Sequence, residues 1–168
     1  MNLAKNLPTK EVVMKKLNND EDLDRMLKLA NLLDNIQVKE TKHPFRPEEK
    51  VTVFYSTEDN WEYYYSPSRA TNVGFAYAKL LEKAGQIFLK ETNVNVINSD
   101  KVYDKIMMTA PKILQEVLML IKDNNQSQID KSVYYGLGLD KEEYRGKDKK
   151  IAHLEKLLAP FQSEQLPE

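Results

Sequence analysis

The sequence predicts an α+β fold that is mostly helical: a bundle of about six helices with one antiparallel β-hairpin near residues 50–66. Two observations predict it. Apolar residues recur three and four positions apart through most of the chain, which is the spacing of helices that bury one face. Residues 50–66 break this spacing and are rich in β-branched and aromatic residues instead.

The length of 168 residues suits one domain with one hydrophobic core. No internal repeat or low-complexity linker divides the sequence. We therefore expect a single domain over residues 1–168. Its parts are an N-terminal helical hairpin (1–36), a connector and β-hairpin (37–67), a helical core (68–160) and a flexible tail (161–168).

The N-terminal hairpin is predicted from two short helical patterns. Thr9 can cap a helix over residues 9–18, with Pro8 before it. A second helix over residues 20–35 has acidic residues in its first turn, where they favour the helix dipole. Its apolar stripe consists of Leu23, Met26, Leu27, Ala30 and Leu33. This stripe predicts that the second helix packs on the core.

Residues 36–49 are expected to form an extended connector, because Pro44 and Pro47 exclude a helix there. Two strands, 51–56 and 61–66, follow on either side of the four polar residues 57–60, which predicts a β-hairpin. Alternation places Val51, Val53 and Tyr55 on one face of the first strand and Trp61, Tyr63 and Tyr65 on one face of the second. Phe54 and Tyr64 are left on the opposite faces.

The remaining chain is expected to be helical. A helix that begins at Ser68 or Thr71 and ends near residue 90 has the widest apolar face, so it is the candidate for the central core helix. Gly74 and Gly85 within it suggest close packing against a neighbour. The next pattern, residues 99–122, contains Pro111, which predicts a kink or a division into two helices.

Residues 111–122 are apolar on more than half of the helix circumference, so we expect them either at the centre of the bundle or in a homodimer contact. A short helix from Ser127 should end at the glycines 136 and 138. Asp140 should cap a last helix, interrupted by Gly146, that ends near Leu158 before Pro160.

Composition excludes several classes of protein. The absence of cysteine excludes disulfides and thiolate metal sites, and two histidines are too few for a His-rich metal centre, so we expect neither metal nor cofactor. No apolar run approaches the roughly 20 residues of a membrane span, and the N-terminus lacks a secretory signal. We expect a cytoplasmic protein that does not contact membranes. The many Asn, Lys and Ile residues are typical of AT-rich genomes and suggest a phage or mobile element as the source.

Charge is balanced, with 25 basic and 26 acidic residues, so no basic excess favours nucleic acid. The acidic run 20–24 lacks the glycine and the final glutamate of a calcium loop. The glycines 136 and 138 follow a helix, not a strand, and lack the other residues of a phosphate loop. His43 and His153 have no recognisable catalytic partner, so we expect no enzyme.

The aromatic hairpin is the most distinctive feature of the sequence. Its six aromatic residues, Phe54, Tyr55, Trp61, Tyr63, Tyr64 and Tyr65, are the predicted partner-binding residues. Aromatic side chains are enriched at protein interfaces, which predicts a non-enzymatic interaction module: a regulator, an inhibitor or an assembly subunit. The alternative is a protein that binds single-stranded nucleic acid. Its bases would stack on Trp61, Tyr63 and Tyr65, and its phosphates would contact Arg46, Lys50 and Arg69.

Overall fold

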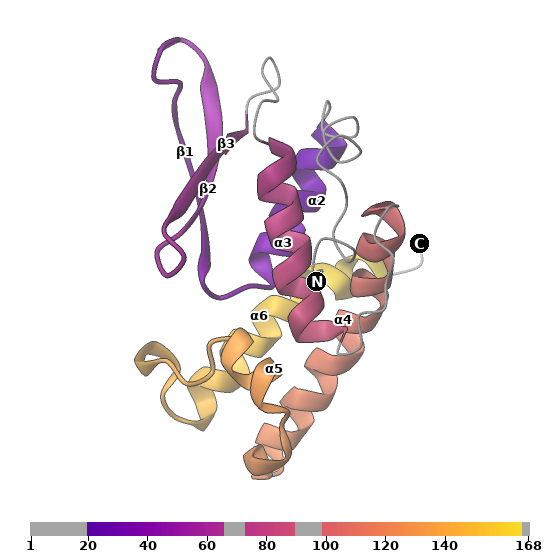
Figure 1. The fold of residues 1–168 in the computed structure, drawn as a ribbon. Helices are drawn as coiled ribbons and strands as arrows, with labels where there is room; N and C mark the ends of the chain where they lie inside the picture. The colour runs from indigo at the N-terminus through magenta and orange to yellow at the C-terminus, as the bar shows by residue number, and fades with distance from the viewer. Residues whose placement is uncertain (1–19, 66–72, 90–98, 166–168) are drawn as a thin grey trace, which may run out of the picture.

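The computed structural model describes residues 20–65, 73–89 and 99–165. A three-stranded antiparallel sheet lies on one side of the molecule, and helices pack against one of its faces (Figure 1). The elements in chain order are α2 (Asp20–Asn31), β1 (Ile36–Lys42), β2 (Lys50–Ser56), β3 (Trp61–Tyr65), α3 (Val73–Phe88), α4 (Ser99–Lys122), η2 (Gln126–Gln128), α5 (Lys131–Gly136), η3 (Glu142–Tyr144) and α6 (Lys147–Gln165). The chain is therefore α+β and mostly helical, as predicted.

The sheet has three strands, where the sequence predicted a two-stranded hairpin. The additional strand, β1, occupies the first half of the expected connector and pairs with β2 from Ile36 opposite Ser56 to Lys42 opposite Lys50. The prolines at 44 and 47 lie in the turn between these strands and do not interrupt pairing. A hydrogen bond from the His43 N–H to the Glu49 carbonyl (2.8 Å) closes the turn.

The described residues contain five α-helices, not six. Pro111 does not divide α4, which runs through it without a break. A proline removes one backbone hydrogen bond, and the burial of Ala110, Pro111 and Leu114 offsets this loss. In the same way α6 passes Pro160 and ends at Gln165, beyond the predicted end near Leu158. The predicted helix over residues 9–18 lies outside the described residues.

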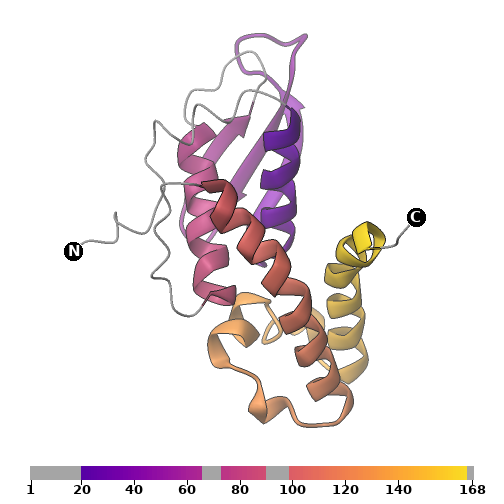
Figure 2. The ribbon, with the colours of Figure 1, turned by 90° about the vertical axis from the view of Figure 1, so that its right-hand side faces the viewer.

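The helix α3 is the centre of the core, as predicted. It contacts α2, β3, α4 and α5. Figure 2 shows α2 and α3 side by side in front of the sheet, with α4 running down from them. The buried residues of α3 are Ala76, Tyr77, Leu80, Leu81, Ala84, Ile87 and Phe88.

Packing against other helices of the same chain accounts for most of the apolar surface of residues 111–122. This part of α4 belongs to a helix that packs against both α3 and α6. Leu114, Val117 and Ile121 are buried, Leu118 is half-buried, and Met119 is 59% exposed. This segment therefore lies in the interior of the bundle, which is one of its two predicted positions. The other position, a homodimer contact, stays a prediction.

Leu114→Ala should lower the free energy of unfolding by about 2–5 kcal/mol, because Leu114 is fully buried and its truncation leaves a cavity. Met119→Ala on the exposed side of the same helix should change stability by less than about 0.5 kcal/mol. Urea unfolding followed by circular dichroism measures both. Equal effects of the two substitutions would show that α4 is not packed as described.

Gly85 does not have the close neighbour that the sequence suggested: a Cβ atom built there has nothing within 4 Å. Gly85→Ala should therefore raise the free energy of unfolding by about 1 kcal/mol, since glycine is unfavourable inside a helix. Gly138 is the contrasting control. It has a φ of +75°, and a Cβ there would collide with the Asp34 carboxyl group, so Gly138→Ala should destabilise the chain. A stabilising Gly138→Ala in the same unfolding measurements would be inconsistent with this turn.

Candidate functional site

The inner face of the sheet carries most of the predicted partner-binding aromatics. The register places Phe54 opposite Tyr63 and Ser56 opposite Trp61. Phe54 and Tyr65 are buried in the core, and Trp61 and Tyr63 are half-buried against it. Phe54 thus shares a face with Trp61, Tyr63 and Tyr65 and not with Tyr64. A partner that binds the folded chain does not reach Phe54 or Tyr65.

The outer face of the sheet carries Tyr55 and Tyr64. All described helices lie on the other side of the sheet (Figures 1 and 2). Tyr64 is 38% exposed, and the Lys39 ammonium group lies 5.0 Å from the centre of the Tyr55 ring. Val53 of β2 is paired with Lys39 of β1 on one side and with Tyr64 of β3 on the other. It is buried, although it does not belong to the main core. The outer face is therefore an ordered surface with apolar side chains beneath its aromatic ones.

The turn at residues 43–49, here called the tip, presents the most exposed large apolar side chain in the described residues. Phe45 is 87% exposed. Its backbone N–H donates to His43 Nδ1 (3.0 Å), which holds the turn, and Arg46 lies 3.7 Å from Glu49. Two of the three predicted phosphate contacts, Arg46 and Lys50, are at this end of the sheet. The third, Arg69, lies outside the described residues.

A groove of about 960 Å³ lies between α2 and β1 on one side and η3 and α6 on the other. Its lining includes Leu27, Ile36, Gln37, Val38, Tyr144, Lys149, His153, Lys156 and Phe161. His153 is half-buried here: its Nε2 donates to the Leu137 carbonyl (2.9 Å), and its ring stacks on Tyr144 at 3.9 Å. These residues come from distant parts of the sequence, so no local motif could have predicted the groove.

A smaller pocket of about 470 Å³ contains Asp34, Glu58, Asp140, Lys141 and Ser132. Lys141 forms an ion pair with Asp34, and this side-chain hydrogen bond raises the pKa of Lys141. The Ser132 hydroxyl donates to Asp130, which caps α5, so it is engaged in helix capping. Among the described residues, no group of three or more His, Asp or Glu side chains could hold a metal ion. The absence of catalysis stays a prediction.

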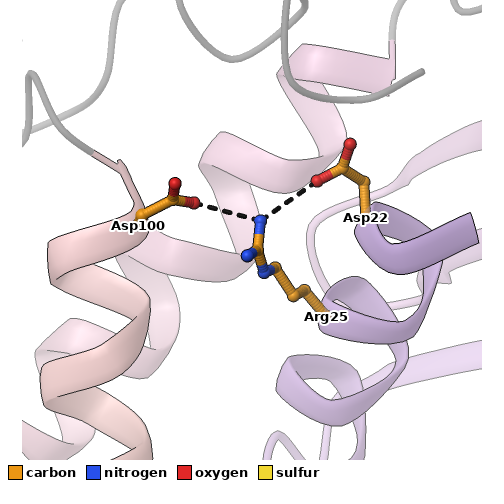
Figure 3. A network of polar contacts seen from close by, with 3 residues as sticks. All are labelled: Asp22, Arg25 and Asp100. Atoms are coloured by element: carbon orange, nitrogen blue, oxygen red, sulfur yellow. Dashed lines mark hydrogen bonds and ion pairs between the residues drawn. The ribbon is translucent and has the colours of Figure 1, made fainter. Parts of the chain in front are cut away.

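A polar cluster connects α2 to the first turn of α4. Arg25 Nη1 lies 3.2 Å from Asp22 Oδ1 and 3.0 Å from Asp100 Oδ1 (Figure 3). The guanidinium group also lies 5.7 Å from the Tyr103 ring centre. Desolvation is the largest single effect and lowers the pKa of Arg25, but the negative charges around it, that of Asp100 foremost, together outweigh it, so the pKa is raised. Arg25 of α2 therefore forms ion pairs both within its own helix and with α4, which indicates a structural role for this cluster.

Tyr77, beside this cluster, is 1% exposed, and its hydroxyl has no hydrogen-bond partner among the described residues. Tyr77→Phe should raise the free energy of unfolding by about 1 kcal/mol, because it removes a buried polar group that is not satisfied. Tyr135→Phe, at an exposed ring, should change it by less than about 0.5 kcal/mol. Thermal or urea unfolding at neutral pH tests both.

The same substitution should alter the pH dependence of stability. Burial raises the pKa of Tyr77 above its usual range, although the charge of Arg25 opposes this. The unfolded tyrosine ionises above a pH of about 10 while the folded one stays protonated, so stability falls as the pH rises past that value. Tyr77→Phe should reduce this fall. An identical alkaline profile for both proteins would contradict the burial of the phenol.

No protein-family model, curated protein or solved structure matches this chain. None of the described helices combines the length and apolar character that a membrane crossing requires. The surfaces described above are therefore the basis for a functional proposal.

Proposed function

We propose that this chain is a non-enzymatic interaction module, acting as a regulator, inhibitor or assembly subunit, that binds a protein partner through the sheet. The observation that supports this most strongly is the one-sided packing of the sheet. Helices cover the inner face, whereas the outer face presents Tyr55 and Tyr64 and the tip presents Phe45. The contact surface therefore consists of these three residues, with Lys39 of β1 over the Tyr55 ring.

The energetics of Phe45 favour a partner. Burying a phenylalanine side chain contributes about 1.5–3 kcal/mol, and at 87% exposure almost none of this is realised within the chain. A protein that covers the tip would recover it. Aromatic residues at the centre of interfaces often contribute about 2 kcal/mol or more each.

The charges near the tip favour an acidic partner surface. Lys42 and Lys50 are directly opposite each other across β1 and β2, and like charges in this position are destabilising. A carboxylate placed between the two lysines would relieve the repulsion. The same two residues thus contribute to partner choice more than to the stability of the free chain.

Single-stranded nucleic acid is the weaker alternative. Base stacking was predicted for Trp61, Tyr63 and Tyr65, and these side chains face the helices. Arg46, one of the predicted phosphate contacts, lies beside Glu49. Neither arrangement favours a stacked base with a phosphate beside it.

The double variant Phe45→Ser with Tyr64→Ser should capture at least about tenfold less partner than the unchanged chain in pull-downs from source-cell lysate, because two interface aromatics are removed. A matched control is Met108→Ser with Met119→Ser, which removes two exposed apolar side chains of α4. Circular dichroism and thermal unfolding establish that both variants are folded.

Two results would argue against the proposal. Undiminished capture by a folded Phe45→Ser, Tyr64→Ser variant would show that the sheet surface does not bind the partner. Capture that disappears after nuclease treatment would favour the nucleic-acid alternative, because the association would then depend on an oligonucleotide.

A further inference from the structure

The strand β1 has one edge that no described strand occupies. The sheet order is β1-β2-β3, so β1 pairs with β2 along one edge only. Every side chain of β1 after Ile36 is exposed. The backbone N–H and C=O groups on the other edge can therefore pair with an additional strand.

The free edge of β1 faces the groove. Ile36, Gln37 and Val38 are consecutive, and all three line it. Successive side chains of a strand point to opposite faces, so three in a row can line one groove only if the edge of the strand faces it. Val38 is 39% exposed, and Leu27 of α2, which also lines the groove, is 37% exposed. The groove thus combines a free strand edge with an apolar wall.

The opposite wall of the groove is basic. Lys149 and Lys156 of α6 both line it, are exposed, and have no carboxylate partner among the described residues. Of the two carboxylates in the lining, Asp34 pairs with Lys141, so Glu143 alone opposes the charges of Lys149 and Lys156. Lys149 and Lys156 are seven residues apart, or roughly 10 Å along α6. Two residues of an extended peptide span roughly 7 Å and four span roughly 13 Å, so carboxylates on one face of such a peptide can approach both flexible lysine side chains.

We infer that the groove binds an extended, acidic segment of a protein partner, which adds as a fourth strand to β1 and places its carboxylates against Lys149 and Lys156. The backbone pairing would supply affinity, and the apolar wall and the lysines would supply selectivity. The inference rests on the proposed function only in taking a protein as the partner, because the surface is a different one from Phe45, Tyr55 and Tyr64.

A second copy of the chain fits this edge less well. Antiparallel pairing of two β1 strands about their midpoint would place Lys39 opposite the Lys39 of the second copy. Charged side chains on an edge strand oppose self-association. An acidic peptide avoids the repulsion between two Lys39 side chains and is attracted by the lysines of β1.

The test uses a library of fluorescein-labelled peptides that are seven residues long, the length of β1. Their sequences alternate Val or Ile with Asp or Glu. Fluorescence anisotropy should show saturable binding that weakens when Asp and Glu are replaced by Asn and Gln. Lys149→Glu with Lys156→Glu should weaken binding at least about tenfold. The matched control is Lys105→Glu with Lys112→Glu, which makes the same charge change at the same spacing on exposed residues of α4.

A second measurement tests strand addition directly. On peptide binding, amide hydrogen exchange followed by NMR should slow at alternate residues of Ile36–Lys42, those whose N–H groups face away from β2. A peptide with N-methyl groups on one alternate set of amides should lose binding, whereas methylation of the other set should not.

The inference fails if no acidic peptide binds at about 1 mM, or if both lysine pairs have equal effects. Binding without alternate protection in β1 would also overturn it. Displacement of the peptide by an oligonucleotide, or a concentration-dependent dimer that excludes the peptide, would assign the groove to nucleic acid or to a second copy. The Phe45→Ser, Tyr64→Ser variant should keep peptide binding, so that failure of the proposed function and failure of this inference are distinguishable.

Discussion

The burial of α3 between the sheet and three other helices determines where the remaining elements lie. Tyr77, Leu80 and Ala84 have almost no exposed surface, so the neighbours must surround this helix. The sheet meets it through β3, and Phe54 and Tyr65 of the sheet join the same core. Because the inner face is used in this way, the aromatic residues of the sheet left for a partner are those of its outer face and the tip.

The groove follows from how α6 is held. Its main contacts are with α4 and with η3, where Lys150 Nζ donates to the Tyr144 carbonyl (2.9 Å). Since α6 is positioned from α4, it faces α2 and β1 without packing closely against them. Side chains such as Leu27, Val38, Lys149 and Lys156 therefore stay accessible on the two walls. A concave space lined by apolar side chains with a few polar groups is typical of binding sites.

The sequence allowed the helices α2 and α3 and the strands β2 and β3 to be predicted, because each buries a stripe with the period of its secondary structure. It did not allow β1, whose residues after Ile36 are exposed on both faces and so carry no burial pattern. Pro111 left a kink or a division into two helices open, and the structure contradicts only the division, because tertiary burial outweighs a local preference. The pairing of Phe54 with Tyr63 depends on turn geometry, and the groove joins residues as distant as Val38 and Lys156, so neither leaves a local signal.

The meander of the sheet has a consequence for the order of folding. Its strands are joined by the turns 43–49 and 57–60, so the antiparallel pairs close short loops with a small entropic cost. Contacts that are close in sequence form quickly. Yet Phe54 and Tyr65 reach an apolar environment only when α2 and α3 cover the inner face of the sheet, because the sheet alone has no cover there. The docking of these two helices is then the step that converts a transient meander into a stable layer.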